Sequence, residues 1–453
     1  MSLRDFLGAC EEAGEVLAIG EELSTEYEIS AIMKALDGGP LLVFERVLDH
    51  PGFKVVANVC NRQRLLRALG VEKGDVVEAY RKLIEAKERP SKPRVVSSGP
   101  GAEEKVIKEP DLGELPVLKH YVGDAGPYIT SALVSALSPD GSIENVSVHR
   151  LLVLDDRRMV IRMVPRHLYR LWQMAKEAGE DLNVAISIGV HPAVILASTT
   201  PAPFGLSEFW IANTLLNGQL RLVECDNGAR APADAEIIIE GVIRTDETAP
   251  EGPLVDITGT YDAVREQPVV EAHRVLMVEE PYYHAILPGG LEHKLLMGFP
   301  REAEIWKAAS AVVPSVKAVN LTPGGCGWLH AVIAIEKNVD GDAKNAILAA
   351  FSAHPSLKHV VVVDPDIDVY DLEQVEWAIA TRFQAGEDLV VIRNVRGSTL
   401  DPSADQETGL TTKVGLDATV PLSRNRRSFE KATIPMSQKV RSLLEGLGSW
   451  ARR

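Results

Sequence analysis

Apolar and polar positions divide the chain into three stretches with different patterns. In the first stretch, Leu3, Phe6, Leu7 and Cys10 share one face of a helix predicted over residues 3–15. The same pattern predicts strands at 16–19, 41–44 and 54–59 and helices at 27–36, 62–69 and 75–88. Residues 1–115 are therefore expected to form a small α/β domain, with a Pro-, Ser- and Gly-rich linker or wrapping loop at 89–101.

The second stretch, residues 116–300, is rich in predicted strands. Apolar runs at 129–137 and 143–154 flank a Pro-Asp-Gly-Ser turn, which indicates a β-hairpin. Further strands are predicted at 159–164, 183–189, 194–198, 220–225, 236–244, 269–278 and 282–287, with helices at 167–178 and 207–217. Many short strands with few helices favour a closed or split antiparallel β-barrel.

The third stretch, residues 301–453, returns to alternating helices and strands. Helices are predicted at 302–312, 342–354 and 372–382, and strands at 316–321, 331–336, 359–363 and 389–392. A polar loop is expected from 397 to 416 and a final helix over 437–450. The fold class is therefore α/β (α+β): a small α/β domain, a split barrel and a C-terminal α/β domain that ends in a helix.

Charge and cysteine content narrow the functional classes. The 453-residue chain has 48 basic and 64 acidic side chains, a net charge of −16, which argues against non-specific nucleic-acid binding. A phosphate-bearing ligand would need a local basic pocket or a metal ion. Four scattered cysteines, a charged N-terminus and the lack of an apolar run of about 18 residues predict a cytoplasmic protein without disulfides or a membrane span.

A Pro- and Gly-rich stretch at 248–259 carries the first candidate chemistry. Glu251 and Asp256 lie five residues apart there, with the apolar Leu254 and Val255 between them. Pro and Gly restrict or extend the backbone angles, so we expect a stiff loop that gives the two carboxylates different environments. One acid can then be ionised while the other carries a proton. A surface turn with two solvated acids is the alternative.

A second group of polar residues lies upstream. Asn145, His167 and Glu208 offer an amide oxygen, an imidazole and a carboxylate, a mixed set that suits Mn²⁺ or Mg²⁺. Asn145 and Arg150 share a predicted strand at odd spacing, so a bulge or the strand end must intervene for both to reach one site. Each residue also has a structural explanation, as a turn residue, a helix-start polar group or a surface ion-pair partner.

Several separated motifs together resemble the UbiD family of prenylated-FMN-dependent decarboxylases. They are residues 145–150, 201–208, 235–241, 249–253 with 258–259, and 413–419, in the order the family has them. The resemblance implies that Asn145, His167 and Glu208 bind a divalent metal, usually manganese, that holds the cofactor phosphate. It also implies flavin contacts from Val148, His149 and Arg150, cofactor contacts from Arg166, Ser198 and Lys413, and a potassium site near Ala197, Ser198 and Thr200.

The resemblance further implies a catalytic triad of Arg150, Glu251 and Asp256. Arg150 is expected to hold Glu251 ionised and to orient a substrate carboxylate, which leaves Asp256 free in a drier pocket to deliver a proton. The family reaction is reversible and non-oxidative: an adduct forms between cofactor and substrate, carbon dioxide leaves, and the acid protonates the carbon. The last position is Asp here, one methylene shorter than the Glu of other members.

The substrate is the least determined feature. Aromatic, heteroaromatic and α,β-unsaturated acids all belong to the family, and the segment 282–301 resembles the members that act on furoate-like acids or on anhydromevalonate phosphate. Furoate-like acids are slightly preferred, and His293 and Arg301 are candidates for binding a heteroatom or a second anion, or else serve as helix-cap and surface groups.

Partners and alternative classes complete the expectations. We expect carbon dioxide as co-product, a flavin prenyltransferase as cofactor supplier, and a homo-oligomer, dimer or hexamer, formed through the C-terminal part. A flavin oxidoreductase on the same barrel is an alternative, although no Gly-x-Gly-x-x-Gly sequence opens a helix after a strand. A non-catalytic assembly subunit is a second alternative, against which the intact triad argues.

Overall fold

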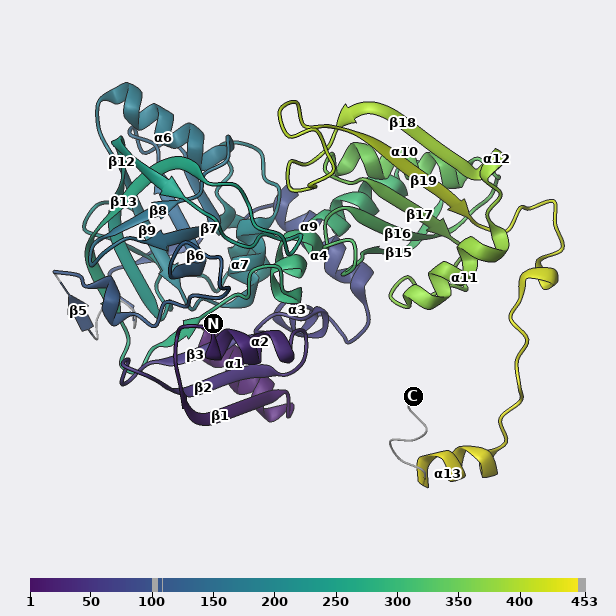
Figure 1. Cartoon of the computed structure of the whole chain (residues 1–453), viewed down its shortest axis with the longest axis horizontal. Coiled ribbons are helices and arrows are strands. Elements are labelled where there is room, and N and C mark those ends of the chain that lie inside the picture. Colours follow the sequence, from purple (N-terminus) through teal and green to yellow (C-terminus); the bar gives the residue numbers. More distant parts are fainter. Residues whose placement is uncertain (100–104, 108, 447–453) are drawn as a thin grey trace.

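A six-stranded antiparallel β-barrel forms one side of the molecule, opposite the C-terminal sheet (Figure 1). The computed structural model describes residues 1–99, 105–107 and 109–446. The barrel strands are, in order, β12 (Ile237–Glu251), β9 (Leu182–Ile188), β6 (Tyr128–Leu137), β7 (Glu144–Val153), β8 (Arg158–Ile161) and β13 (Arg265–Met277). Pairing of β12 with β13 closes the barrel, and β5 (Lys105–Ile107) extends β13. The predicted barrel is thereby confirmed.

Two hairpins of this barrel shape the site. The predicted hairpin of β6 and β7 is present, and its register shifts between Ile129 and Ala132, opposite Arg150. The other hairpin joins β12 to β13, and its outer end pairs Thr248 with Pro268 and Glu251 with Arg265. The prediction of a loop from 248 was therefore wrong for residues 248–251, which are held in a ladder; the loop begins at Gly252.

Two predicted strands of the middle stretch take other roles. The prediction of a strand at 194–198 was wrong: these residues lie in helix α7 (Pro192–Thr199), which His191 caps and Pro192 begins. Helices and strands are told apart by the spacing of their apolar residues. A short run in which nearly every residue is apolar and buried has no such spacing, so the sequence cannot distinguish the two. The strand predicted at 220–225 exists as β10 (Arg221–Glu224), but it pairs with β4 (Arg94–Val96) and β11 (Arg230–Pro232) outside the barrel. The predicted linker at 89–101 thus contains β4.

The N-terminal sheet has the order β1 (Val16–Leu23), β2 (Leu41–Val47), β3 (Lys54–Ala57) and β14 (Tyr282–His284). Its helices are α1 (Leu3–Glu12), α2 (Glu28–Ala35), α3 (Arg62–Ala68) and α4 (Val76–Glu88). The strand predicted at 282–287 is therefore shorter than expected, and it joins this sheet because Tyr282–His284 run parallel to Lys54–Val56.

The C-terminal sheet has the order β15 (Ser315–Leu321), β16 (His330–Glu336), β17 (His359–Val363), β19 (Leu410–Ala418) and β18 (Leu389–Arg396). Its helices are α10 (Asp342–Ala353), α11 (Leu372–Arg382) and the short α12 (Ala385–Asp388). The loop predicted from 397 to 416 was wrong for residues 410–416, because they pair with both β17 and β18. This strand carries Lys413.

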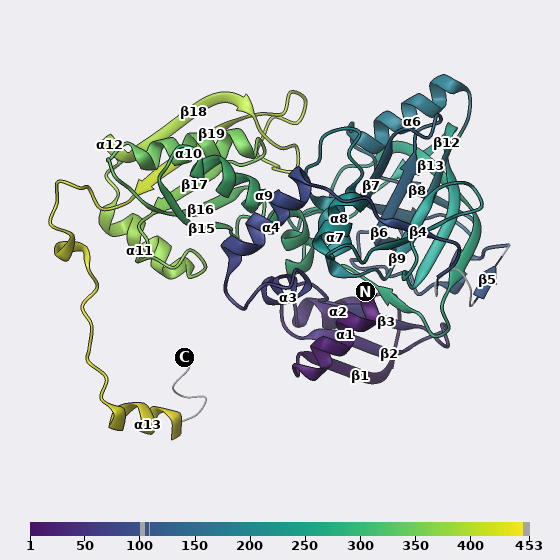
Figure 2. The ribbon, with the colours of Figure 1, turned by 180° about the vertical axis from the view of Figure 1, so that it is seen from behind.

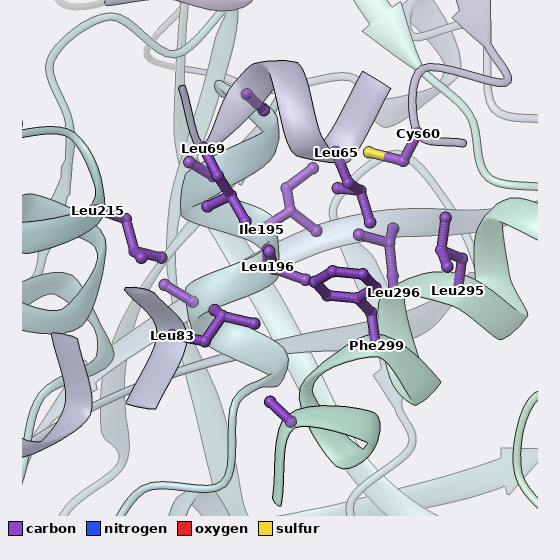
Figure 3. Close-up of a cluster of buried hydrophobic side chains, with 14 of the residues drawn as sticks. Cys60, Leu65, Leu69, Leu83, Ile195, Leu196, Leu215, Leu295, Leu296 and Phe299 are labelled. Atoms are coloured by element: carbon purple, nitrogen blue, oxygen red, sulfur yellow. The ribbon is translucent and has the colours of Figure 1, made fainter. Parts of the chain in front are cut away.

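Helix α9 (Leu291–Ser310) joins the parts of the chain. It begins eleven residues before the predicted start at 302 and continues through Pro300. Figure 3 shows Leu295, Leu296 and Phe299 of α9 in one apolar cluster with side chains of α3, α4, α7 and α8 (Glu208–Leu215). Burying such side chains stabilises the fold by about 1.5–3 kcal/mol each. From behind, Figure 2 shows the barrel and the C-terminal sheet on either side of this region.

The end of the described chain leaves the body. After β19 an extended segment leads to α13 (Gln438–Gly446), which stands apart from the rest in both views (Figures 1 and 2). The final helix is confirmed over these residues, while 447–450 lie outside the described residues. Within the described chain, no helix combines the length and apolar character that crossing a membrane requires. The four cysteines are all free.

Candidate active site

Arg150 brings three carboxylates together at one end of the barrel. Its Nε and Nη2 donate to the two oxygens of Glu251 at 2.9 and 3.0 Å. Its Nη1 donates to Asp256 at 2.8 Å, and Nη2 donates also to Asp262 at 3.0 Å. The register of the β6–β7 hairpin shifts opposite Arg150, and a bulge on this strand was one way for Asn145 and Arg150, at their odd spacing, to face the same side.

Glu251 is the anchored acid of this cluster. It is the last residue of β12, and its side chain is fully buried. A bidentate arginine is the partner that a buried carboxylate needs. The hydroxyl of Tyr128 donates to Glu251 at 3.3 Å and accepts from the amide of Gly252 at 3.1 Å. Burial first, and the charge of Glu251 second, raise the pKa of the Tyr128 phenol, so this hydroxyl remains a donor.

Asp256 was expected to lie free in a drier pocket, but it is hydrogen-bonded to Arg150. One carboxylate oxygen accepts from Arg150, and the other accepts from the amide of Ile257 at 2.6 Å. Its side chain is 18% exposed. The loop that holds it is closed by hydrogen bonds between the main chains of Asp256 and Thr260 and of Asp256 and Gly259. Arg150 therefore bridges both acids of the predicted triad.

Sequence reasoning missed part of this cluster. Asp262 accepts from Arg265 at 2.7 Å as well as from Arg150, and the Nε of Arg162 lies 3.6 Å from the same carboxylate. The available signal was the hairpin itself: once 248–251 are assigned to a strand, the returning strand places Arg265 beside Glu251. A loop prediction for 248–259 removed that signal.

Asn145, His167 and Glu208 also meet. The amide of Asn145 contacts both oxygens of Glu208 at 3.2 Å, and His167 Nδ1 lies 4.0 Å from Glu208 Oε1. Glu208 opens α8, with Ser207 as its N-cap, and His167 opens α6 (His167–Ala178). Burial raises the pKa of Glu208 to about 8, against the lowering effect of the Val146 amide and Asn145.

This donor set fits a divalent cation. A buried carboxylate with no cation beside it is costly, and a metal ion would offset its charge. The amide oxygen of Asn145 accepts from Ser147 at 3.1 Å and becomes available if the amide turns over. Among the described residues no three His, Cys, Asp or Glu side chains are grouped for metal binding, so a metal ion at this position would need the Asn145 amide oxygen as a ligand.

A group of cations lies towards the C-terminal sheet. Arg166, Arg301 and Lys413 all act electrostatically on His354, whose pKa burial and these charges lower to about 3. Burial lowers the pKa of Lys413 to about 8 and that of Arg301 to about 10. The Lys413 amine donates to the carbonyl of Pro355 at 2.6 Å. No carboxylate of the described residues lies within ion-pair distance of these three cations, so the group is suited to a bound anion.

The remaining predicted site residues lie around these three groups. His149 contacts Ser147 through Nε2 and the Arg162 carbonyl through Nδ1, both at 2.9 Å, and burial lowers its pKa to about 4. Val148 neighbours it on β7 and is half-buried. The hydroxyls of Ser198 and Thr200, expected near potassium with Ala197, bond back to carbonyls of α7 at 2.6 and 2.9 Å.

His293 and Arg301 lie on one helix but reach different neighbours. The Nδ1 of His293 accepts from the amide of Gly289 at 3.1 Å. Burial lowers the pKa of His293, and the charges of Asp256 and Arg150 act on it, so its neutral imidazole faces the carboxylate cluster. Arg301 stacks over Trp328 within the cation group. His293 therefore lies beside the carboxylate cluster, and Arg301 lies within the group of cations.

Family models match the chain along most of its length. The 3-octaprenyl-4-hydroxybenzoate carboxy-lyase N-terminal domain matches residues 7–86, the Rift-related domain 94–291 and the C-terminal domain 294–418. Two relatives are named anhydromevalonate phosphate decarboxylase. The one from Methanothermobacter thermautotrophicus is 44% identical over 93% of this chain and 97% of its own length, and the one from Methanocaldococcus jannaschii is 46% identical over 92% and 96%.

Solved structures agree with these matches. The UbiD-class enzyme HmfF from Pelotomaculum thermopropionicum, in complex with FMN, has a TM-score of 0.92 and 42% identity, covering 97% of this chain and 98% of its own. An evolved dimeric form of the same enzyme with prenylated FMN has a TM-score of 0.89 and 40% identity, covering 97% and 99%.

Proposed function

Because the chain belongs to the UbiD family of carboxy-lyases, we propose that it decarboxylates anhydromevalonate phosphate with prenylated FMN as cofactor. The observation that carries this choice is the high identity to two decarboxylases of that name over nearly the whole chain. Furoate-like acids, the first expectation from the residues alone, remain the comparison substrate for the test.

The cation group supports a substrate with a second anion. Arg301 and Lys413 are desolvated enough that their pKa values fall, yet no acid of the described residues pairs with them. A phosphate on the cofactor and a phosphate on the substrate would together supply the missing negative charge. Lys413 and the exposed Arg166 are proposed for the cofactor phosphate, and Arg301 for the substrate phosphate. A furoate-like acid would leave Arg301 only the charge of Glu304, which lies beyond ion-pair distance.

The carboxylate cluster supports proton delivery at the reacting carbon. Arg150 is proposed to orient the substrate carboxylate, Glu251 to hold Arg150 in place, and Asp256 to protonate the carbon from which carbon dioxide leaves. His293, neutral and near Asp256, is proposed to contact the substrate. Bound prenylated FMN would supply the electron sink for carbon–carbon cleavage.

The metal-ligand trio supports cofactor binding. Asn145, His167 and Glu208 are proposed to hold Mn²⁺ or Mg²⁺ against the cofactor phosphate, with K⁺ near Ser198. Val148 and His149 are proposed to contact the flavin from β7. A flavin prenyltransferase in the same compartment, proposed to be the cytoplasm, would be needed to supply the cofactor.

The C-terminal segment supports a homo-oligomer. Val440 and Leu443 lie three residues apart on α13 and are 42% and 63% exposed, while Ile434 and Met436, just before the helix, are 92% and 51% exposed. A nine-residue helix is marginal alone in water, so its apolar side is proposed to pack against a second copy of the chain. Light scattering of the full chain, and of a variant with Val440 and Leu443 changed to Ser, tests this proposal.

A substrate comparison tests the function. The chain is co-produced with a flavin prenyltransferase, and carbon dioxide release is measured with anhydromevalonate phosphate and with 2-furoate. We expect kcat/KM to be higher for the phosphorylated acid, and Arg301→Gln to raise its KM by about 10- to 100-fold, because a charged hydrogen bond contributes about 1.5–3 kcal/mol. Equal or better turnover of 2-furoate, unaffected by Arg301→Gln, would overturn the substrate assignment.

A further inference from the structure

Asp262 shares the guanidinium of Arg150 with the two acids of the proposed triad. We infer that Asp262 is a positioning residue for decarboxylation: it anchors Arg150 so that Asp256 is the acid that yields to substrate, and its charge favours the protonated form of Asp256. The inference rests on the proposed function, in which Arg150 binds the substrate carboxylate and Asp256 delivers the proton.

The hydrogen bonds of Arg150 show why one acid must yield. A guanidinium has five N–H donors, and four are used: one on Nε, two on Nη2 and one on Nη1. Only one donor, on Nη1, is left for a substrate. A bidentate carboxylate needs two. Asp256 occupies the other donor on Nη1, so its departure frees the pair.

Exposure and partners show which acid stays. The side chain of Asp256 is 18% exposed, that of Asp262 is 11% exposed, and Glu251 is fully buried. Asp262 is further held by Arg265 at 2.7 Å and by the amide of Ala263 at 2.9 Å. Burial opposes ionisation of Asp262, but Arg265, Arg150 and Arg162 outweigh it and lower its pKa. Asp262 therefore remains an ionised anchor when Asp256 leaves.

The charge balance of the cluster links Asp262 to the protonation of Asp256. Three arginines contact the three acids Glu251, Asp256 and Asp262: Arg150 on β7, Arg162 just after β8 and Arg265 at the start of β13. Tyr128 and His293 also face the cluster and are neutral. The net charge of these six side chains is zero when Asp256 is ionised and +1 when Asp256 is protonated. The carboxylate of the arriving substrate offsets that positive charge.

The proton balance of the step follows. When the substrate carboxylate takes the place of Asp256 on Arg150, Asp256 takes one proton from solvent. The carbon–carbon bond to the carboxylate breaks, carbon dioxide leaves, and the proton of Asp256 forms the new carbon–hydrogen bond. Without the charge of Asp262, the cluster is already positive with Asp256 ionised, so Asp256 accepts its proton less readily.

The test compares pH profiles of the prenylated-FMN enzyme. The kcat and KM for anhydromevalonate phosphate are measured from pH 5.5 to 9 for the wild type, Asp262→Asn, Asp262→Glu and Arg265→Gln. The control is Asp155→Asn, which removes an acid from an exposed arginine pair away from the site. Melting temperatures of all variants check that they are folded.

The expected results have opposite signs. Removing an acid (Asp262→Asn) should move the alkaline limb of the kcat profile about one pH unit lower, without raising KM, because one acid no longer opposes ionisation of Asp256. Removing a cation (Arg265→Gln) should move the limb higher. Asp262→Glu should restore the wild-type limb, and Asp155→Asn should leave it unchanged.

Two other results would overturn the inference. One is an unchanged alkaline limb in both Asp262→Asn and Arg265→Gln. The other is a loss of kcat in Asp262→Asn that is equal at every pH and accompanied by a raised KM, which a merely structural role predicts. Failure of the proposed function is distinguishable, because then the wild type has no turnover or Asp256→Asn retains full turnover.

Discussion

The two charged regions of the site differ in how their charges are compensated. Around Arg150, every acid has an arginine within hydrogen-bond distance, and the cluster is balanced within the chain itself. Towards the C-terminal sheet, Arg301 and Lys413 have no acid within ion-pair distance among the described residues. On the barrel side, the basic group beside Glu208 among those residues is His167, whose pKa burial lowers.

This difference indicates that the Arg150 cluster is organised before ligands bind, whereas the groups around Arg301, Lys413 and Glu208 need a ligand to balance their charge. A balanced cluster holds its geometry without a ligand, which is what positioning a substrate carboxylate and a proton requires. Desolvated and unpaired charges cost free energy until a ligand of opposite charge arrives. The first region is therefore expected to respond to mutation by losing turnover and stability, and the second by losing affinity for metal and phosphate.

Asp256→Asn should give the largest effect. The asparagine keeps the shape of the side chain and its contact to Arg150 but carries no transferable proton, so kcat should fall by about 10²- to 10⁴-fold. Decarboxylation and deuterium incorporation into the product measure this loss. An unchanged kcat, in a variant whose melting temperature matches the wild type, would remove Asp256 from the proton-donor role.

Arg150→Met should disrupt the cluster of arginines and carboxylates by removing its central cation. Glu251 would be left buried and without its bidentate partner, so the free energy of unfolding should fall by about 3–5 kcal/mol. Denaturant unfolding of the ligand-free protein measures the change. Arg150→Met with Glu251→Gln is the matched control, since it removes both charges and should recover part of the loss; no recovery would mean that the pair is not the cause.

Lys413→Met should behave in the opposite way. In the ligand-free protein the buried ammonium is unfavourable at pH 7, below its pKa of about 8, so its removal should leave stability unchanged or raise it by about 1–2 kcal/mol. Binding of FMN should weaken by about 10- to 100-fold, which fluorescence titration measures. A variant that is less stable by several kcal/mol yet binds FMN normally would contradict this.

Metal addition should give the smallest effect and depend on pH. Folding raises the pKa of Glu208 from its ordinary value near 4.5 to about 8, so the metal-free protein holds a proton there that the unfolded chain does not. Its stability should therefore fall between about pH 5 and pH 8. Mn²⁺ competes with that proton, and the rise in melting temperature on adding Mn²⁺ should be larger at pH 8 than at pH 5.5.

Glu208→Gln is the control for the metal prediction. It removes the titrating group and keeps the size of the side chain, so both the decline in stability with pH and the response to Mn²⁺ should diminish. An equal response to Mn²⁺ in this variant would place the metal elsewhere.

Elements with a clear period were predictable, and those defined by distant partners were not. The helix at His167 and the hairpin of β6 and β7 follow from spacing that a few neighbouring residues set. The buried run in α7 was misread because apolar residues on all sides have no period. Residues 248–251 and 410–416 look like loops by composition and are strands because other strands lie beside them.

The amino-acid sequence alone determined the residue types of the site, the order of the three parts and, through its motifs, the family. Only the tertiary structure decided which charges meet: that Arg150 holds Asp256 and Asp262 as well as Glu251, and that Lys413 lies with Arg301. The physical reason is the distance along the chain over which each interaction acts. Periodicity and capping act over a few residues, whereas an ion pair across a hairpin depends on register and barrel closure, which only the packed chain defines.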